Sequence, residues 1–462
     1  MPSRHAGPMA IATVNPATGR TEKEFTPYDD AEVRRRLDLA SDTFAAYRRT
    51  TFVERARLVS AAADLLEGEV PDIARVMTTE MGKTFASAKA EVAKCAATLR
   101  WYADHAEGYL ADEVITSAAS DSRVVYQPMG PVLAVMPWNF PMWQVIRFAA
   151  PALMAGNVGL LKHASNVPQT ALILEDLFRR AGFPAGAFQT LLVESGRVAG
   201  LIADPVVRAV TITGSEAAGR SVAEAAGRAI KKSVLELGGS DPFVVLPSAD
   251  LDKAISVGVT ARIQNNGQSC IAAKRFIVHR DVYDRFEKGF VEAMAGLSVG
   301  DPMDPGSEVG PLATAGGRSD VEELVADARA RGAAVLCGGE PMAGPGYYYT
   351  PTVLTGVTSS MRVAREELFG PVAVLYRVED AEEALALSND TDFGLGASVW
   401  THDPSERALF GEGLAAGMVF VNAMVASTPE LPFGGVKNSG YGRELSTHGI
   451  REFCDVKTIF TA

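Results

Sequence analysis

The sequence predicts an α/β protein with two domains built on parallel sheets, together with a small β extension. In the first third, three segments carry apolar residues at helical spacing, namely 29–49, 52–67 and 83–107. From about Ser122 onward, short β-rich runs alternate with helical patterns, which is typical of a parallel sheet covered by helices on both faces. Gly238-Gly239 and then Asp241-Pro242 interrupt this alternation. A second alternating block follows, so we expect two α/β domains that meet near residue 237.

The first alternating block contains five predicted strands, at 132–136, 158–161, 190–193, 209–212 and 233–237. Helices are expected from about Pro141, from Pro168 to Arg180, from about Gly196 and from about Ser215. Pro151 lies within the first of these segments. We expect it to start a new helical turn, because proline disfavours a helical residue before it.

The second block contains predicted strands at 243–246, 275–279, 333–337, 372–375, 397–400 and 418–421, with helices between them. Gly300 to Gly310 is rich in glycine and proline and is expected to be a surface loop. The sequence shows no internal repeat.

Composition narrows the class of protein. The 462 residues are 47% hydrophobic and 22% charged, as in ordinary globular proteins, and they are enough for roughly two to four domains. A net charge of −12 argues against nucleic acid or an anionic membrane as a partner. The most apolar stretch, Phe148 to Leu161, is broken by Pro151, Gly156 and Asn157 and is too short to span a bilayer.

The cysteines and the N-terminus point to a cytoplasmic protein. Met1 to Ala12 has no apolar run long enough for a signal peptide. Four cysteines are far apart and form no CxxC pair, so we expect a reducing compartment, no disulfide framework and no metal site.

Cys270 is a candidate nucleophile. It ends the polar segment Asn265-Asn-Gly-Gln-Ser-Cys270 and precedes small residues, a setting compatible with an exposed thiol at the end of an element. A buried structural cysteine is the usual alternative, and the local sequence leaves both open. The other cysteines, Cys95, Cys337 and Cys454, lie on helical or strand patterns and are expected to be structural.

Three further segments carry polar groups next to predicted strands. Glu236 lies in an apolar run at a strand end, where burial would raise its pKa toward that of a general base; an ion-paired surface glutamate is the alternative. Asn139, between Pro137 and Pro141, has a defined direction and could stabilise an oxyanion or merely cap a turn. Gly214 and Ser215 lie where a strand turns into a helix, where backbone amides could bind a phosphate.

These motifs together resemble the aldehyde dehydrogenase superfamily. The resemblance runs from Asn15–Gly19 to Phe433–Gly440, nearly the whole chain. Within it, the motifs follow the order of the family, at Pro137–Pro141, Leu235–Gly239, Gly267–Cys270 and Glu366–Pro371. The chain is most similar to the bacterial NADP-dependent succinate-semialdehyde dehydrogenases.

The resemblance implies two Rossmann-like domains with parallel sheets and a small β oligomerisation extension. Residues 1–121 and 129–236 would form the cofactor-binding domain and 237–432 the catalytic domain. Segments 122–128 and 433–462 would mediate assembly into a homodimer or homotetramer, since 122–127 and 456–460 have residues suited to edge pairing.

The resemblance also implies a mechanism. Cys270 would add to the aldehyde carbon, while Asn139 and the backbone N–H of Cys270 stabilise the oxyanion. Hydride transfer to the nicotinamide would leave a thioester, which water activated by Glu236 would hydrolyse to the acid. A CoA-acylating enzyme is an alternative that Glu236 argues against, and a non-catalytic protein is a second that the intact set argues against.

The implied cofactor is NADP, with NAD possible. The resemblance assigns its contacts to Met136, Pro137, Trp138, Asn139, Lys162, Ser165, Gly214, Ser215, Leu237, Glu367 and Phe369. Relatives that prefer NAD often have a glutamate at the position of Ser165, which would repel a 2′-phosphate. A hydroxyl at Ser165 with Lys162 nearby favours NADP.

The implied substrate is an aldehyde that carries a carboxylate, succinate semialdehyde or a related one such as glutarate semialdehyde. Arg147 matches an arginine that holds this carboxylate in relatives, Ser427 matches a hydroxyl contact, and Phe433 would line the site. An ion pair on a helix surface is the alternative for Arg147. Some relatives have a second arginine where this chain has Gln264; Arg262, two residues away, would point elsewhere.

Overall fold

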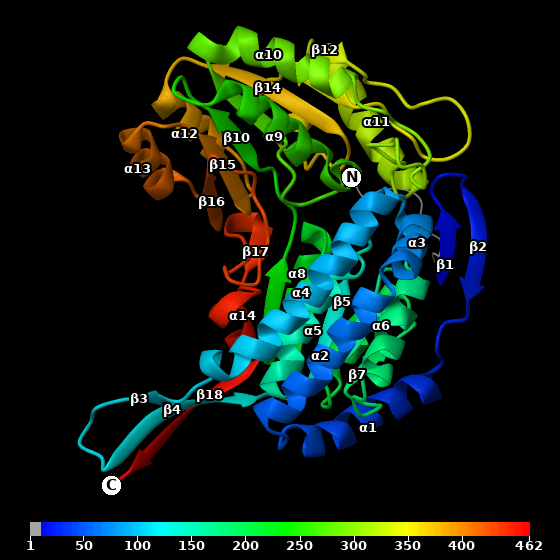
Figure 1. Cartoon of the computed structure of the whole chain (residues 1–462), viewed down its shortest axis with the longest axis vertical. Helices are drawn as coiled ribbons and strands as arrows, with labels where there is room; N and C mark the ends of the chain where they lie inside the picture. Colours follow the sequence, from blue (N-terminus) through cyan, green and yellow to red (C-terminus); the bar gives the residue numbers. More distant parts are fainter. Residues whose placement is uncertain (1–10) are drawn as a thin grey trace.

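The computed structural model describes residues 11–462. The sequence predicts that Met1 to Ala12 is not a signal peptide, and most of this segment lies outside the described residues. Two layered α/β units stack along the longest axis, and a narrow ribbon projects from one end (Figure 1). In the described residues, no helix is long and apolar enough to cross a membrane.

A six-stranded sheet forms the centre of the first unit. Its order is β17-β9-β8-β5-β6-β7. The strands are β5 (Pro131–Met136), β6 (Val158–His163), β7 (Phe188–Thr190), β8 (Ala209–Thr213), β9 (Lys232–Glu236) and β17 (Gly440–Tyr441). All pairs are parallel except that of β17 with β9. Because β6 and β8 lie on opposite sides of β5, the chain reverses direction across the sheet there, which is where α/β folds bind ligands.

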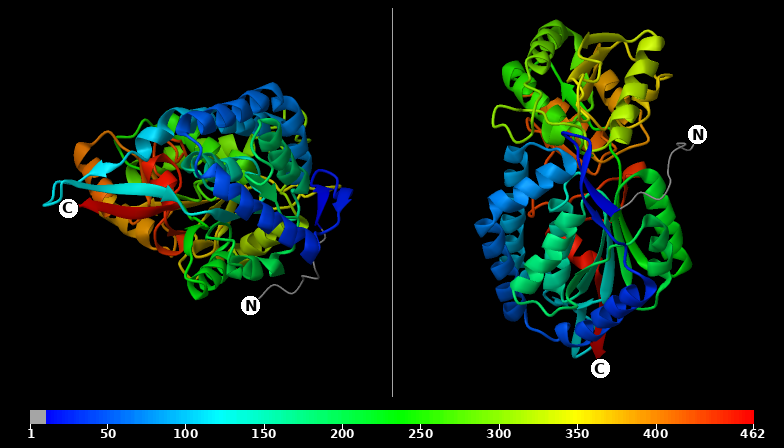
Figure 2. Two further views of the ribbon diagram at one scale, coloured as in Figure 1. Left: turned by 90° about the horizontal axis from the view of Figure 1, so that it is seen from below. Right: turned by 90° about the vertical axis from the view of Figure 1, so that its right-hand side faces the viewer.

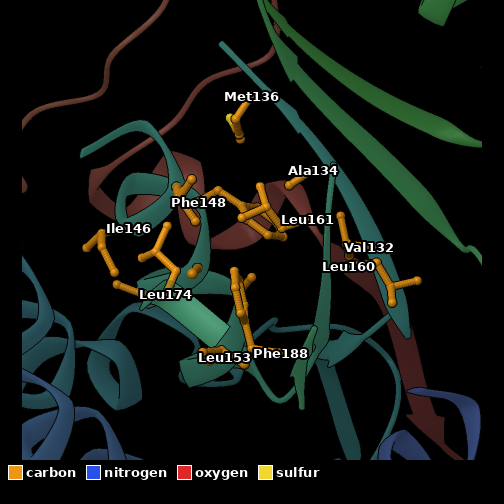
Figure 3. Close-up of a cluster of buried hydrophobic side chains, with 14 of the residues drawn as sticks. Val132, Ala134, Met136, Ile146, Phe148, Leu153, Leu160, Leu161, Leu174 and Phe188 are labelled. Atoms are coloured by element: carbon orange, nitrogen blue, oxygen red, sulfur yellow. The ribbon is translucent and has the colours of Figure 1, made fainter. Parts of the chain in front are cut away.

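Within residues 11–462, eight helices surround this sheet. They are α1 (Asp30–Tyr47), α2 (Phe52–Gly68), α3 (Val70–Met81), α4 (Phe85–Tyr109), α5 (Trp143–Ala155), α6 (Pro168–Arg180), α7 (Val198–Ala203) and α8 (Glu216–Arg228). Local chemistry sets their starts: Thr51 and Glu54 form a reciprocal capping box at α2. The sheet is apolar on both faces because helices cover both, and side chains of β5, β6, α5 and α6 meet in the core (Figure 3).

A seven-stranded sheet forms the second unit. Its order is β12-β13-β14-β11-β10-β15-β16. The strands are β10 (Pro242–Val245), β11 (Arg275–His279), β12 (Ala334–Cys337), β13 (Thr352–Thr355), β14 (Val372–Val378), β15 (Gly396–Trp400) and β16 (Met418–Val421). The sheet is parallel except at β12. Its helices are α9 (Leu251–Ile263), α10 (Arg280–Ala295), α11 (Ala315–Ala330), α12 (Ala381–Asn389) and α13 (Pro404–Gly413).

The projecting ribbon is a third sheet, of order β18-β4-β3. The strands β4 (Asp121–Pro128) and β18 (Cys454–Thr461) pair antiparallel along their whole length, and β3 (Glu113–Val114) adds to β4. The two predicted β segments near 122–127 and 456–460 therefore lie side by side, with the chain end at the tip (Figures 1 and 2). A short helix, α14 (Ser446–Glu452), leads into β18.

The α/β prediction is confirmed, with local differences. Pro151 does not start a new turn, because α5 runs unbroken through it; every residue of α5 is buried, and tertiary packing outweighs the local preference. The third predicted strand, at 190–193, ends at Thr190 and begins earlier. The hairpin of β1 (Ile11–Asn15) and β2 (Arg20–Phe25), the helix α3 and the strand β13 were not predicted. The division into a cofactor-binding and a catalytic domain stays a prediction.

Candidate active site

Cys270 follows a loop with an unusual backbone. After α9, Asn265, Asn266 and Gly267 all have positive φ, at 55°, 58° and 76°. A β-carbon at Gly267 would lie 2.3 Å from the carbonyl oxygen of Gly370, so only glycine fits there. The side chain of Asn265 donates to the carbonyl of Asn139 at 2.7 Å, and that of Asn266 donates to two further carbonyls. The loop before Cys270 is therefore fixed from both sides.

Two buried cations hold the same loop from behind. Arg262 donates to the carbonyls of Ala273 and Gly267 at 2.8 and 2.7 Å. Lys274 donates to the carbonyl of Cys270 at 2.6 Å and pairs with Glu367 at 3.2 Å. Arg262 thus points away from the substrate side, as expected. Lys274 is a site residue that the motifs did not reveal, although a lysine four residues after a candidate nucleophile and beside small apolar residues is a signal in the sequence.

Cys270 lines a cavity of about 390 Å³. Burial raises the pKa of its thiol to about 12, partly offset by the charges of Lys274 and Arg147. Within residues 11–462, its backbone N–H donates to no recorded acceptor, so it can still donate to a substrate oxygen. The thiol needs a proton acceptor before it can act as a nucleophile.

Four chain segments form the cavity wall, at 84–94, 140–147, 260–271 and 424–433, with Glu308 at its edge. Three predicted substrate residues, Arg147, Ser427 and Phe433, line it together with Cys270. Gln264 lines it too, where some relatives would have an arginine. The structure therefore brings the proposed nucleophile and the proposed carboxylate contacts into one space.

The guanidinium of Arg147 already has partners within the protein. Its guanidinium forms a buried ion pair with Glu444, donates to Thr213 at 3.2 Å and lies 4.4 Å from the ring centre of Phe433. The alternative of an exposed ion pair on a helix surface does not hold, because Arg147 is only 2% exposed. Glu444 offsets the positive charge of Arg147. Sequence reasoning missed Glu444, which lies almost 300 residues from Arg147 along the chain.

Glu236 lies in the same buried cluster and does not line the cavity. Burial raises the pKa of its carboxyl well above its usual range, and the neighbouring Glu444 adds to this, while Arg147 opposes it. Within the described residues, neither carboxyl oxygen of Glu236 has a hydrogen-bond partner. Such a carboxyl could serve as a base only after turning from the cluster toward Cys270.

Asn139 is 4% exposed and is not part of the cavity wall, which its neighbours Phe140 and Gln144 line. Its amide donates to the carbonyl of Gln268 at 3.1 Å and accepts from Gln144 at 3.0 Å. These contacts fix the amide next to the cysteine loop. One N–H of the amide remains for another acceptor.

The predicted cofactor residues gather at the carboxyl ends of neighbouring strands. Met136, Lys162, Gly214 and Leu237 lie at or just beyond the ends of β5, β6, β8 and β9. Trp138 and Phe369 meet edge to face, with ring centres 5.7 Å apart, so two distant segments converge there. Their location at the reversal of the sheet is where a dinucleotide would bind.

Three of these residues have informative contacts. Lys162 is 7% exposed, and no carboxylate pairs with it among residues 11–462; burial lowers its pKa. Gly214 is not free for a phosphate, since its N–H donates to the carbonyl of Glu236 at 3.0 Å. The hydroxyl of Ser215 caps α8. A buried cation without a partner fits an anionic cofactor group such as a 2′-phosphate.

The chain belongs to the aldehyde dehydrogenase family, whose model matches residues 4–459. It is therefore an oxidoreductase of that family. This confirms the resemblance drawn from the motifs.

Several relatives with a named activity are similar to the chain over almost its whole length. The chain is 59% identical to succinate-semialdehyde dehydrogenase [NADP(+)] 1 of Mycobacterium tuberculosis, covering 98% of this chain and 100% of the relative. It is 58% identical to succinate-semialdehyde dehydrogenase [NADP(+)] of Mycobacterium avium, covering 98% and 97%. Among solved structures, the succinic semialdehyde dehydrogenase of Streptococcus pyogenes in complex with NADP+ is 37% identical, with a TM-score of 0.95 over 97% of this chain and 99% of that one.

Proposed function

We propose that this protein oxidises succinate semialdehyde to succinate with NADP+ as the oxidant. The observation that carries the proposal is that Cys270, Arg147 and Ser427 line one cavity, so a nucleophile and groups able to bind a carboxylate would face the same substrate. The names of relatives at 58–59% identity over almost the whole chain support it.

In the proposed reaction, the thiol of Cys270 gives its proton to water, and its sulfur bonds to the aldehyde carbon as the π bond of the carbonyl opens to an oxyanion. The amide of Asn139 and the N–H of Cys270 donate to the resulting oxyanion, which lowers the energy of this step. Lys162, Ser165, Glu367 and Phe369 would hold NADP+, which would supply the hydride acceptor that converts the adduct on Cys270 to a thioester. Glu236 then takes a proton from water, and the water oxygen displaces the sulfur to release succinate.

The residues of the cofactor site fit NADP+. Lys162 would supply a positive charge to the 2′-phosphate, and the hydroxyl of Ser165 a hydrogen bond. Met136 to Asn139, Gly214, Ser215 and Leu237 would form the wall next to the phosphates and the nicotinamide. Glu367, held by Lys274 and by the N–H of Gly239, would face a ribose together with Phe369.

The direct test is to mix purified enzyme, NADP+ and succinate semialdehyde and follow the absorbance of the reduced nicotinamide. We expect turnover without coenzyme A and a higher kcat/KM with NADP+ than with NAD+. Glutarate semialdehyde and butanal serve as comparison substrates. A requirement for coenzyme A, or no signal with any of these aldehydes, contradicts the proposal.

We further propose that the chain assembles as a homodimer or homotetramer through its third sheet and works in the cytoplasm. The exposed side chains of Val456 and Phe460 on β18, 66% and 60% exposed, support the first statement. The four cysteines of the described chain form no disulfide, as is usual for proteins of a reducing compartment, which supports the second.

A further inference from the structure

Lys94 lies on α4 and lines the same cavity as Cys270. Its ammonium group donates to the hydroxyl oxygen of Ser427 at 2.8 Å and lies 3.9 Å from the ring centre of Trp143 on α5. The helices α4 and α5 pack against each other beside the first sheet (Figure 1). The sequence presents Lys94 as one of many polar residues on an amphipathic helix, and the resemblance assigns it no role.

The other charged groups of the cavity wall already have partners. Glu91 pairs with Lys83 and also accepts the backbone N–H groups of Met142 and Trp143 at the start of α5. Glu308 accepts the N–H and the hydroxyl of Ser298.

The positive charge of Arg147 is likewise offset by the carboxylate of Glu444. Lys94 is the cation of the wall that pairs with no carboxylate within residues 11–462. The side chain of Lys94 is half-buried, so its ammonium group has lost part of its water. Holding this charge without a counter-charge is unfavourable, and a bound anion would reduce that cost.

We propose that Lys94, together with Ser427, binds the carboxylate of the substrate. This inference rests on the proposed function and names the residue that selects its substrate class. The hydroxyl of Ser427 accepts from Lys94, so its own hydrogen is free to donate to a carboxylate oxygen. The ammonium group has two further hydrogens for the same anion.

The two cations, Arg147 and Lys94, have different contacts and therefore different tasks. Arg147 is tied inward to Glu444 and Thr213, next to Glu236, and this orders the reacting side of the cavity. Among the described residues, the ammonium group of Lys94 contacts a hydroxyl and an aromatic ring but no carboxylate, so a bound anion would stabilise it more than it would Arg147. Burial lowers the pKa of Lys94 to about 8, which a bound carboxylate would raise again.

The test compares succinate semialdehyde with butanal, a neutral aldehyde of the same length, in steady-state kinetics. In Lys94→Met, which keeps the length of the side chain, we expect the ratio of kcat/KM for succinate semialdehyde to that for butanal to fall about 10- to 100-fold, mainly through KM. Lys94→Arg keeps the charge and should retain most of the ratio. Lys89→Met, on the exposed side of α4, is the matched control and should retain all of it.

A second readout does not need turnover of the charged substrate. Succinate should inhibit butanal oxidation by the wild-type enzyme, and its inhibition constant should rise by a similar factor in Lys94→Met. Thermal unfolding of each variant checks that the fold persists.

The outcomes separate the two proposals. If the wild-type enzyme prefers succinate semialdehyde and Lys94→Met keeps that preference, the Lys94 assignment is wrong and the proposed substrate stands. If Arg147→Met alone removes the preference, the carboxylate belongs to Arg147. If the wild-type enzyme shows equal kcat/KM for both aldehydes, the proposed substrate itself is wrong.

Discussion

Glu236 and Glu444 are buried near the guanidinium of Arg147, which pairs with Glu444, while Arg443 adds a weaker positive charge near Glu236. Two buried carboxyls beside one cation hold a proton more tightly than exposed ones, because ionising both leaves an uncompensated charge. A carboxyl that keeps its proton in this buried cluster cannot act as a base until it moves out of the cluster. This predicts that hydrolysis of the thioester, more than its formation, depends on Glu236.

Glu236→Gln should therefore form the thioester and then stop. We expect a rapid burst of reduced cofactor of about one equivalent per active site, followed by a steady rate at least about 100-fold below wild type. Stopped-flow absorbance measures both phases. A steady rate near that of wild type would contradict the role of Glu236, and Cys270→Ser, which should show no burst, is the control.

The charge state of Lys94 predicts a pH dependence of substrate binding. With a pKa of about 8 in the free enzyme, Lys94 is charged below that pH and neutral above it, so KM for succinate semialdehyde should rise as pH increases through 8. Glu91 and Cys95 on α4 and Arg147 on α5 set the local field. Butanal corrects for other titrations, since its KM should not follow this rise. An equal rise for both substrates would contradict the prediction.

Ser165 predicts the cofactor preference. A carboxylate in its place would repel the 2′-phosphate that Lys162 attracts, so Ser165→Glu should lower kcat/KM for NADP+ by about 10- to 100-fold while leaving that for NAD+ unchanged or higher. Initial rates with each cofactor measure this. Ser165→Ala is the control and should lose far less. An equal loss with both cofactors would indicate damage to the site as a whole.

At the residue scale, the sequence predicted the cavity residues that belong to motifs. It missed the residues that reach the site only through the packing of distant segments. Cys270, Arg147, Ser427 and Phe433 do share one cavity. Lys94 and Glu444 could not be found, because a lysine on an amphipathic helix is usually solvated and a glutamate after an arginine usually pairs locally. Only the packing of α4 on α5, and of the C-terminal segment beneath them, buries these groups. The roles assigned to the predicted residues stay predictions.

At the scale of elements, Glu80 on α3 holds the start of α6. Its buried carboxyl accepts the N–H groups of Gln169 and Thr170 at 2.8 and 3.0 Å, and the hydroxyls of Thr170 and Thr13 at 2.7 and 2.8 Å. It thereby serves as a distant cap for a helix whose own preceding residue, Val167, cannot cap it. One side chain joins α3, α6 and β1.

Removing this carboxyl should destabilise the fold. We expect Glu80→Ala to lower the unfolding temperature by about 2–4 °C or more, because four donors lose their buried acceptor. Differential scanning calorimetry measures it, with Glu24→Ala on the exposed strand β2 as the control. An unchanged transition would mean that water replaces the carboxyl at no cost.

The predicted elements show where sequence patterns suffice. Amphipathic spacing located α1, α2 and α4 within a few residues, because each presents one apolar face to the core. Pro151 was misjudged because α5 is buried all round, so its stability comes from its neighbours rather than from its own residues. The antiparallel strand β12 was predicted as a strand, but its direction depends on a partner, β13, that the sequence did not reveal.

At the scale of the whole molecule, β18 is an edge strand of the described chain and carries exposed apolar side chains. Such an edge is a template for pairing with a second copy. We expect Phe460→Asp combined with Val456→Lys to shift the mass in solution from that of an oligomer to that of a single chain. Light scattering after size-exclusion chromatography measures this, with Thr21→Lys on the exposed strand β2, away from β18, as a control for added charge. An unchanged mass would exclude β18 from the interface.

The segments that form the cavity wall differ in how firmly the structure holds them. The segment that carries the nucleophile, 260–271, is fixed by left-handed residues and buried cations, whereas 424–433 runs as a loop between β16 and β17. Phe433 packs on Arg147 and exchanges two backbone hydrogen bonds with Glu444, so it belongs to the reacting side. A library confined to the nine positions 424–432 would be a route to enzymes for other aldehydes, because selection there acts on which molecule enters and spares the contacts around Arg147 and Cys270.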